Sequence, residues 1–424
     1  ERRVVIFDRN GAPVKQFLAG ETKIRSIEWV GDEAILLLRS ETDQPRLSVG
    51  NVRAEWSRAN IIPLDDRRDV ISVFAGQRYV VNAIAGFHGI RKAGGSWKGY
   101  FGGFRKGDSS GIKDRILDGH PSLYAVDLRT GSIDLVGYPP NPGLGKIQYT
   151  RDWLVADDGT VAATLDIDND DGAWKLKGPS GTTIASGKQA MGRISLLGLS
   201  ADGNDAIYSF YDQTAGQTIY SQTPLAGASG RNIWDGEDVD RIVYRPLSSR
   251  IEGFLTSSKS AELVDPAKDA RTEAIFSAFP SSNMRLEGWS REMDTYIART
   301  SGKFDSGTWY RVDSAGDVRK VIGLERPAIQ GPLVGPVQSF KYTAQDGLEI
   351  DAVLTLPPGR EASGLPAVIL PHGGPASHDN VEFDWWAQAY ASRGYAVLQP
   401  NFRGSTNRGD RFRDAGNGEW GRKM

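Results

Sequence analysis

Residues 122–131 read SLYAVDLRTG, an alternating apolar strand followed by a polar turn that ends in glycine. The same arrangement occurs at residues 5–11 (VIFDRNG) and at residues 309–316 (WYRVDSAG). Weaker copies of this hairpin lie near Val49, Lys175, Thr223 and Asp265. From residue 127 onward the copies are spaced by roughly 43 to 48 residues, a period typical of the blades of a β-propeller.

Other strand pairs fill the intervals between these hairpins. We expect residues 194–199 to pair with 206–210, and residues 284–289 to pair with 296–299. Four short strands per unit with Gly-rich turns predict an all-β propeller, and seven hairpins predict a seven-bladed β-propeller over residues 1–333. A β-sandwich is the alternative, but sandwiches do not usually sustain one period over about 300 residues. The first blade is expected to be truncated, because its hairpin lacks the inner strands that precede the other hairpins.

One interval is longer than this period allows. Residues 86–118 are rich in Gly, Lys and Arg and show little alternation, which predicts an insertion or a loop between blade elements. Residues 107–111 (GDSSG) match the Gly-x-Ser-x-Gly pattern of a nucleophile elbow. An elbow follows a buried strand and precedes a helix. Residues 101–106 (FGGFRK) are no such strand, so we do not expect Ser109 to be a nucleophile.

The pattern changes near residue 334. A longer hairpin is expected at 337–356, and it is followed by two apolar runs, 367–370 (AVIL) and 395–398 (YAVL). Apolar runs of this kind are typical of strands that are buried on both faces of a parallel sheet. Between them lies a helical pattern for which Asp379 is the expected N-cap and Glu382 its capping-box partner. Strand, helix and strand at this spacing predict that residues 334–424 begin an α/β domain.

The residues that carry chemistry follow the first of these runs. Residues 370–375 read LPHGGP. In α/β-hydrolases, an HGG-type loop after a core strand supplies a backbone N–H to the oxyanion hole. A tetrahedral intermediate develops negative charge on the former carbonyl oxygen, and fixed donors must already point at that position. Glycines let the backbone approach the substrate, since they carry no Cβ. A tight turn at the end of a strand is the structural alternative.

Further motifs accompany this loop in a fixed order: residues 383–388 (FDWWAQ), 401–406 (NFRGST) and 418–421 (GEWG). Together with LPHGGP, they resemble the catalytic domain of the prolyl oligopeptidase family of serine peptidases, nearest its acylaminoacyl-peptidase branch. The motif resemblance covers residues 366–424. It implies that a seven-bladed β-propeller precedes the N-terminal part of an α/β-hydrolase domain. It also implies that the propeller acts as a size filter for short peptides, which are hydrolysed through an acyl-enzyme.

The resemblance also implies roles for four residues. Gly374 would donate the oxyanion N–H, next to Gly373, and His372 would be a loop-bracing or oxyanion-side group. Arg403 would lie near the cleft, either on the substrate side or in a buried salt bridge that braces the loop. The catalytic Ser, Asp and His are expected after Met424, in that order. Because a triad works as a unit, we expect the 424-residue chain alone to be inactive and to be a fragment of a longer protein.

Composition narrows the function further. The chain contains no Cys, which excludes disulfides, thiolate metal sites and a cysteine nucleophile. The formal net charge of −2 gives no basic field for nucleic acid, and no run of 18 apolar residues points to a membrane span. We expect no metal and no cofactor. The expected partners are a peptide substrate and the remaining part of the hydrolase domain, while oligomeric state and compartment (periplasm or cytoplasm) stay open.

Two alternatives to the peptidase interpretation were kept. The first is an isopeptidase of the same family that acts on a compact threaded or cyclic peptide, such as a lasso peptide. The second is a non-catalytic propeller that serves as a binding module. The second alternative leaves apolar strand surfaces at 367–370 and 395–398 without cover.

Overall fold

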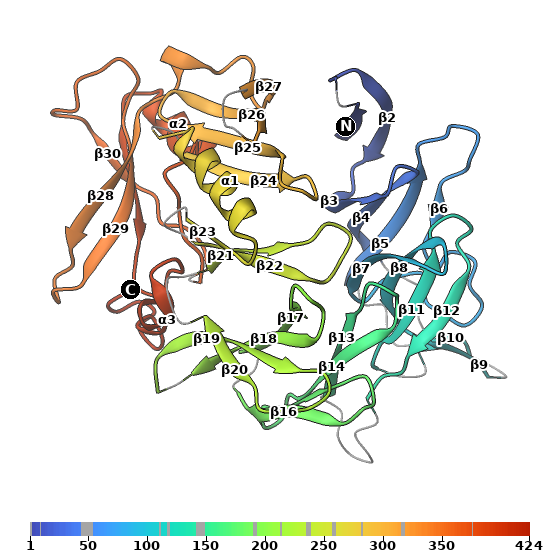
Figure 1. Cartoon of the computed structure of the whole chain (residues 1–424). Helices are drawn as coiled ribbons and strands as arrows, with labels where there is room; N and C mark the ends of the chain where they lie inside the picture. The colour runs from blue at the N-terminus through green and yellow to red at the C-terminus, as the bar shows by residue number, and fades with distance from the viewer. Residues whose placement is uncertain are drawn as a thin grey trace. The chain divides into compact units, whose positions relative to one another are not determined.

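The fold is given by a computed structural model of the chain (Figure 1). It describes residues 2–424 except 9, 44–53, 110–111, 117–118, 141–148, 190–192, 213, 235–238, 257–259, 281–282, 315–318 and 375. By internal contacts, the chain divides into two compact units. Unit 1 comprises residues 1–211, 219–235 and 247–251, and unit 2 comprises residues 212–218, 236–246 and 252–424.

Small antiparallel sheets dominate the chain up to residue 324. Most have four strands that follow one another in sequence order, as the hairpin repeat predicts. The described strands of these sheets are β1 (Arg2–Phe7) with β2 (Pro13–Gly20); β3 (Lys23–Val30), β4 (Ala34–Asp43), β5 (Ala54–Pro63) and β6 (Ile71–Ser72); β13 (Tyr149–Val155), β14 (Val161–Asp168), β15 (Ala173–Lys177) and β16 (Thr183–Lys188); β17 (Ile194–Leu199), β18 (Asp205–Asp212), β19 (Gln217–Pro224) and β20 (Arg231–Trp234); β21 (Val239–Tyr244), β22 (Ile251–Thr256) and β23 (Ala261–Leu263); and β24 (Asn283–Trp289), β25 (Thr295–Gly302), β26 (Asp305–Asp313) and β27 (Arg319–Leu324).

The registers confirm the strand pairs expected from the sequence. Ile194 lies opposite Phe210 in the β17–β18 pair, and Trp289 lies opposite Tyr296 in the β24–β25 pair. Lys175 and Thr223 fall within β15 and β19, each of which forms a hairpin with the next strand. The weaker copy near Val49 lies outside the described residues.

Residues 86–118 differ from the insertion expected there. β7 (Phe87–Ala93) and β8 (Ser96–Gly103) form two strands of a four-stranded sheet in the order β12-β11-β8-β7, completed by β11 (Ser122–Asp127) and β12 (Ile133–Gly137). The glycines that hid the alternation have a packing role. A Cβ on Gly102 would lie 2.1 Å from the carbonyl oxygen of Ala85, so this strand needs a residue without a side chain. Only β9 (Lys106–Ser109) and β10 (Ile112–Ile116) extend from the sheet, as a separate two-stranded pair.

A helix occupies the position expected for the hairpin near Asp265. α1 (Pro266–Ser277) follows the three-stranded sheet β21-β22-β23. Asp265 caps the helix, because its side chain accepts hydrogen bonds from the amides of Ala267 and Lys268. Pro266 at the first helical position stabilises the same start. The polar residue that suggested a turn is therefore an N-cap.

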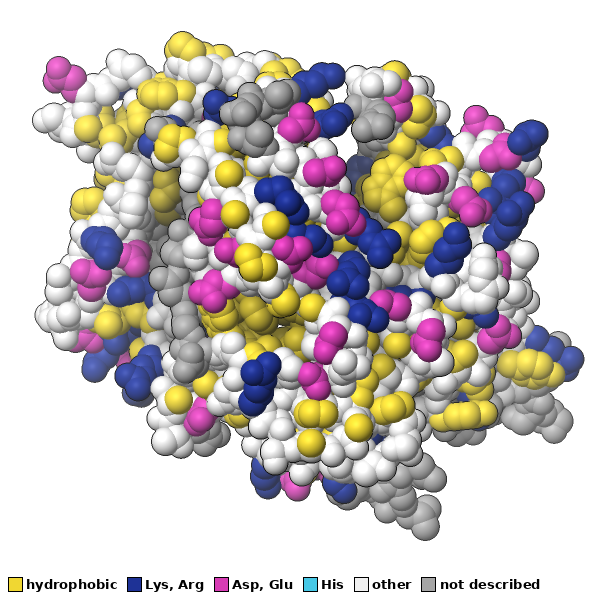
Figure 2. All heavy atoms as spheres, in the orientation of Figure 1, with side chains coloured by type: hydrophobic (Ala, Val, Ile, Leu, Met, Phe, Trp, Pro, Cys, Tyr) yellow, Lys and Arg dark blue, Asp and Glu magenta, His cyan; other side chains and the backbone are white. Residues whose placement is uncertain are grey.

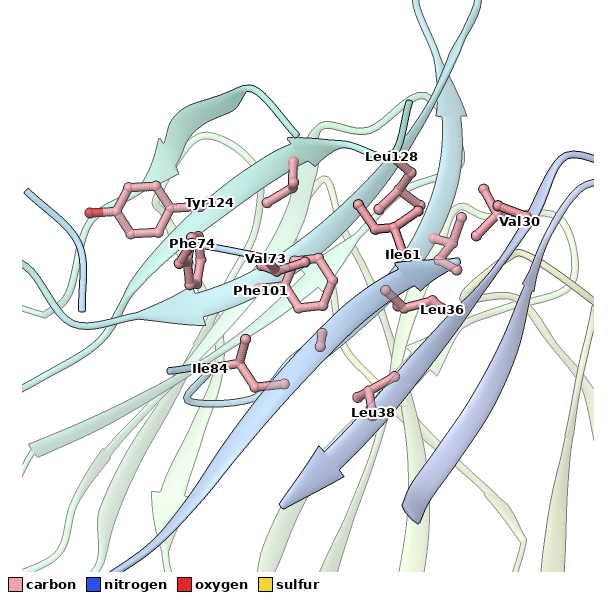
Figure 3. Close-up of a cluster of buried hydrophobic side chains, with 14 of the residues drawn as sticks. Val30, Leu36, Leu38, Ile61, Val73, Phe74, Ile84, Phe101, Tyr124 and Leu128 are labelled. Carbon is pink, nitrogen blue, oxygen red and sulfur yellow. The ribbon is translucent and has the colours of Figure 1, made fainter. Parts of the chain in front are cut away.

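The largest buried cluster joins neighbouring sheets of unit 1 (Figure 3). Phe101 is fully buried and packs edge-on against Phe74, with ring centroids 6.3 Å apart. Around these rings lie Val30, Leu36, Ile61, Tyr124 and Leu128, which come from alternating positions of their strands. Facing apolar sides of adjacent sheets thus form one core, which is the packing that a period of two requires.

A different sheet begins after the expected boundary at residue 334, beyond the 3₁₀ turn Gly331–Leu333. Its order is β28-β29-β31-β30, with β28 (Val337–Thr343), β29 (Glu349–Thr355), β30 (Ala367–Ile369) and β31 (Ala396–Asn401). β30 and β31 are parallel, and α2 (Trp385–Ala391) lies between them in the sequence. This is the expected strand–helix–strand unit, and α3 (Gly409–Asp414) follows it.

The visible surface carries side chains of both charges. Figure 2 shows Lys and Arg side chains interspersed with Asp and Glu side chains across the visible face. In the described part of the chain, no helix is both long and apolar enough to cross a membrane.

Candidate functional site

The candidate site is formed by two loops that leave the same edge of the C-terminal sheet. Because β30 and β31 are parallel, with Val368 opposite Val397, their carboxyl ends lie side by side. The loop after β30 carries residues 370–378, and the loop after β31 carries residues 402–407. The order of the sheet therefore brings the LPHGGP and NFRGST motifs together.

His372 connects the two loops. Its ring stacks on the ring of Phe402, with centroids 4.6 Å apart and an interplanar angle of 18°. Its Nε2 lies 2.9 Å from the Oγ atom of Ser405, and its Nδ1 lies 2.7 Å from the carbonyl oxygen of Gly373. The buried Ser405 hydroxyl donates to the carbonyl of Phe402 at 2.6 Å and is also within hydrogen-bond distance of His372. These contacts are those of a residue that braces the glycine loop.

The far end of the glycine loop is held in the same way. The amide of Thr406 donates to the carbonyl of Ser377 at 2.9 Å. The Nδ1 atom of His378 lies 2.7 Å from the Oγ1 atom of Thr406. The loop is thus fixed to its neighbour on both sides of the two glycines. Sequence reasoning gave no role to Ser405, although it lies in the NFRGST motif, or to His378, which lies in no motif.

Gly373 and Gly374 differ in backbone conformation. Gly374 has φ +131°, and a Cβ there would lie 2.9 Å from the amide nitrogen of Ala376. Gly373 has no such restriction, because a Cβ built on it meets no atom within 4 Å. Within the described residues, the amide of Gly374 donates no hydrogen bond, as an oxyanion donor requires. Its role in an oxyanion hole stays a prediction.

Arg403 forms its hydrogen bonds with Asp346 and Lys423. It is 8% exposed, its Nη2 donates to Oδ2 of Asp346, and its Nε donates to the carbonyl of Lys423 at 2.8 Å. Burial raises the pKa of the Asp346 carboxyl, but the hydrogen bond and charge of Arg403, the amide of Leu348 and the charge of Lys423 together hold the pKa below its ordinary value. This geometry corresponds to the bracing salt bridge, one of the two roles expected for Arg403.

Asp379 is not the N-cap of the following helix. Asp384 caps α2 instead, accepting a hydrogen bond from the amide of Ala387 at 2.7 Å. Asp379 is held through its backbone, whose N–H and carbonyl both bond the side chain of Asn401. Its Oδ2 is buried and has no hydrogen-bond partner among the residues that the structure describes. Burial raises the pKa of Asp379, and the opposing attraction of His372 does not cancel this effect.

Replacing Asp379 with Asn should therefore increase stability at neutral pH. Folding raises the pKa of this carboxyl group above its value in the unfolded chain, which is near 3.8. Such a group stabilises the folded protein when the pH is below that unfolded value, and this contribution is lost as the pH rises through the folded pKa. The difference in unfolding free energy between variant and parent should grow from about pH 4 to about pH 7. Urea denaturation across this range measures it, with Glu361→Gln as the control for losing a surface carboxylate. A difference that is independent of pH contradicts the raised pKa.

The segment between the glycine loop and α2 is anchored on the β24–β27 sheet, which the sequence analysis did not predict. The amide of Phe383 donates to the Oγ atom of Ser301 at 2.8 Å. Arg299 contacts Glu325 at 2.6 Å and Glu382 at 3.1 Å. The hydrogen bond and charge of Glu325, together with those of Glu382, raise the pKa of Arg299 despite its partial burial. Unit 2 therefore holds the candidate loop on the last sheet of the repeat.

In the described residues, no three His, Asp or Glu side chains are grouped to hold a metal ion.

The elbow-like GDSSG stretch lies in the β9–β10 pair, where Ser109 is opposite Ile112. Ser110 and Gly111 lie outside the described residues. A strand rather than a helix follows this stretch, so it lacks the context of a nucleophile elbow.

Comparison with known proteins identifies the C-terminal segment. Residues 381–424 match the model of the "Prolyl oligopeptidase family". The chain is 30% identical over 241 residues to "Dipeptidyl aminopeptidase BIII" of Pseudoxanthomonas mexicana, which covers 54% of this chain and 34% of that protein. It is 31% identical over 251 residues to "Dipeptidyl peptidase family member 6" of Caenorhabditis elegans, which covers 54% and 33%. The chain thus spans about a third of the length of the curated relatives it matches.

Solved structures share the fold at low identity. Prolyl oligopeptidase B from Galerina marginata superposes with a TM-score of 0.59 at 12% identity, over 97% of this chain and 57% of that one. A puromycin hydrolase superposes with a TM-score of 0.51 at 15% identity, over 96% and 70%. The curated relatives carry dipeptidyl-peptidase names. By its motifs, its matched segment and its relatives, the chain is similar to the prolyl oligopeptidase family.

Proposed function

We propose that the complete protein is a serine peptidase that hydrolyses short peptides through an acyl-enzyme. The observation that supports this most directly is the Gly374 amide. It lies on a loop fixed by His372 and Ser405, and it donates no hydrogen bond within the described residues. A fixed donor of this kind stabilises a developing oxyanion and so lowers the activation barrier by about 3 kcal/mol.

The position of β30 in its sheet indicates where the strand that carries the nucleophilic serine would lie. β30 is the edge strand of its sheet, and Ile369 on it is 61% exposed. The loop after β30 must adjoin the nucleophile elbow for both to serve one oxyanion. We propose that a further strand of the protein pairs with the free edge of β30 and carries the serine. The rest of the hydrolase domain is then the covering partner of this apolar edge.

In the proposed reaction, the serine attacks the scissile carbonyl, and a histidine after Met424 takes its proton and later gives it to the leaving amine. The described residues take no part in this proton transfer and instead stabilise the oxyanion. Gly374 donates its N–H to the oxyanion, while His372, Ser405 and Phe402 keep the loop in position. Because the donor is fixed before the reaction, no reorganisation is needed as charge develops.

The sheets before residue 324 would serve as the size filter. Six sheets of three or four strands, together with the β1–β2 pair, supply the parts of seven blades within the described residues. We propose that they close into a seven-bladed propeller whose cavity admits short peptides. Since the curated relatives are named dipeptidyl peptidases, release of dipeptides from peptide ends is the preferred form of the activity. Action on a threaded or lasso-type peptide is the alternative within the same site.

Labelling with a fluorescent fluorophosphonate, which reacts covalently with activated serines, tests this proposal. We expect the full-length protein to be labelled at a serine after Met424 and the 424-residue chain to remain unlabelled. Absence of labelling and of peptide hydrolysis in the full-length protein would instead favour the non-catalytic binding module. Labelling of the 424-residue chain by itself would contradict the placement of the nucleophile.

A further inference from the structure

Asn401, the last residue of β31, binds the loop that carries Gly374 through its side-chain amide. Its Oδ1 accepts a hydrogen bond from the backbone N–H of Asp379 at 2.7 Å, and its Nδ2 donates to the carbonyl of Asp379 at 3.0 Å. Two residues that face each other in an antiparallel sheet exchange a pair of N–H···O bonds in the same way. The Asn401 side chain thus does at Asp379 what the backbone of a neighbouring strand would do.

This contact ties the loop directly to the C-terminal sheet. The backbone of Asn401 lies opposite Asp351 in the β29–β31 pair. The contacts of Ser377 and His378 differ in this respect, because both are with Thr406, which itself belongs to a loop. Groups placed on a strand are held more precisely than groups placed on a loop. Asn401 is therefore suited to pass the fixed position of the sheet to the segment that follows Gly374.

The two hydrogen bonds require an amide at position 401. The N–H of Asp379 can only donate and its carbonyl can only accept, so the partner must supply one acceptor and one donor. An ionised aspartate has the shape of asparagine but supplies acceptors only, and one of them would face the Asp379 carbonyl. Asn is the shortest side chain that carries an amide, which explains this residue type in the NFRGST motif.

We propose that Asn401 is a positioning residue for the oxyanion hole. It fixes the loop after β30 relative to the sheet, so that the Gly374 amide stays where the oxyanion forms. The inference rests on the proposed peptidase function, since it assigns a role in the same site. Asp379 follows Gly374 by only five residues, so a shift at Asp379 is passed on to the donor. Asn401 acts through this loop and not through contact with the substrate.

Replacing Asn401 with Asp in the full-length protein tests this role. We expect kcat for a hydrolysed peptide to fall about 10- to 100-fold, because small displacements of a catalytic group have effects of this size. The rate constant of fluorophosphonate labelling should fall with it. In that reaction the serine oxygen bonds to phosphorus, fluoride leaves, the serine proton passes to the catalytic histidine, and the phosphonyl oxygen occupies the oxyanion position.

Peptide affinity separates positioning from general damage to the site. It is measured by calorimetry after the labelled serine has been replaced by Ala, in the presence and absence of Asn401→Asp. The two dissociation constants should agree within about two-fold, since a contact that acts only in the transition state leaves substrate binding unchanged.

Hydrogen–deuterium exchange of residues 372–380 gives a measurement that does not depend on activity. Exchange should be about ten-fold faster in Asn401→Asp, because the Asp379 carbonyl loses its donor. Asn401→Ala removes both hydrogen bonds without adding a charge and should show the same changes. Asn380→Asp is the matched control and should behave as the parent, since Asn380 is exposed and its side chain forms no hydrogen bond with the described residues.

Unchanged kcat in folded Asn401→Asp and Asn401→Ala would overturn the proposal, even if exchange becomes faster. A loss of peptide affinity as large as the loss of kcat would overturn it as well. Failure of the peptidase function appears separately, as a parent protein that fluorophosphonate does not label, and it removes this role whatever the exchange shows.

Discussion

Replacing Gly374 with alanine in the full-length protein is expected to lower kcat by about 10²- to 10³-fold with little change in KM. The reason is local. At φ +131° an alanine is strained, and its Cβ would lie 2.9 Å from the amide nitrogen of Ala376. The loop must therefore rotate and turn its N–H away from the oxyanion, while contacts with the rest of the substrate are unaffected.

The neighbouring glycine is a matched control. Gly373→Ala adds the same methyl group one residue earlier, where it meets no atom within 4 Å. We expect its kcat to remain within a few-fold of the parent, with steady-state hydrolysis of one peptide as the measurement for both variants. Equal losses in the two variants would show that the loop as a whole, and not the Gly374 amide, limits the reaction.

Replacing Phe383 with alanine is expected to lower the free energy of unfolding by about 3 kcal/mol. Phe383 is 8% exposed, and the guanidinium of Arg326 lies 4.6 Å from the centre of its ring. Alanine leaves a cavity and removes this cation–π contact. Urea denaturation of the full-length protein, followed by tryptophan fluorescence, measures the change.

Leu333→Ala is the control for that experiment, because Leu333 is 63% exposed and its truncation should cost less than about 0.5 kcal/mol. Phe383→Ala should also reduce the peptidase rate, since the ring of Phe383 holds the segment that follows the glycine loop against Arg326, just after β27. A variant as stable as the parent would mean that the anchor contributes little to holding the loop.

Local patterns in the sequence predicted much of the fold. The period-two strands, their turns and the strands β30 and β31 were identified correctly because each depends on neighbouring residues. The expectation that β30 is buried on both faces was wrong, because β30 lies at the edge of its sheet and Ile369 is 61% exposed. The β7–β8 pair was missed since its glycines hide the alternation, although close packing such as that of Gly102 against Ala85 requires them. α1 was missed because the same Asp265 side chain is compatible with a turn or with an N-cap.

The candidate site was predictable only in part, for a similar reason. The motifs located His372 and Gly374 because their residue types are specific to one chemistry. The contacts that fix them, such as Ser405 with His372 and Arg299 with Glu382, join residues 33 and 83 positions apart. Sequence spacing contains no signal for such pairs.

The strand order of the C-terminal sheet determines when the candidate site can form during folding. β31, the last of the described strands along the chain, lies between β29 and β30. β30 therefore has no described neighbour in the sheet until the chain has passed through α2 and returned, which makes this a late, non-local step of folding. Insertion of β31 is also the event that brings the loop of Ser405 against the loop of His372. The arrangement thus links assembly of the site to completion of the sheet, so a partly folded chain has the glycine loop without the contacts that fix it.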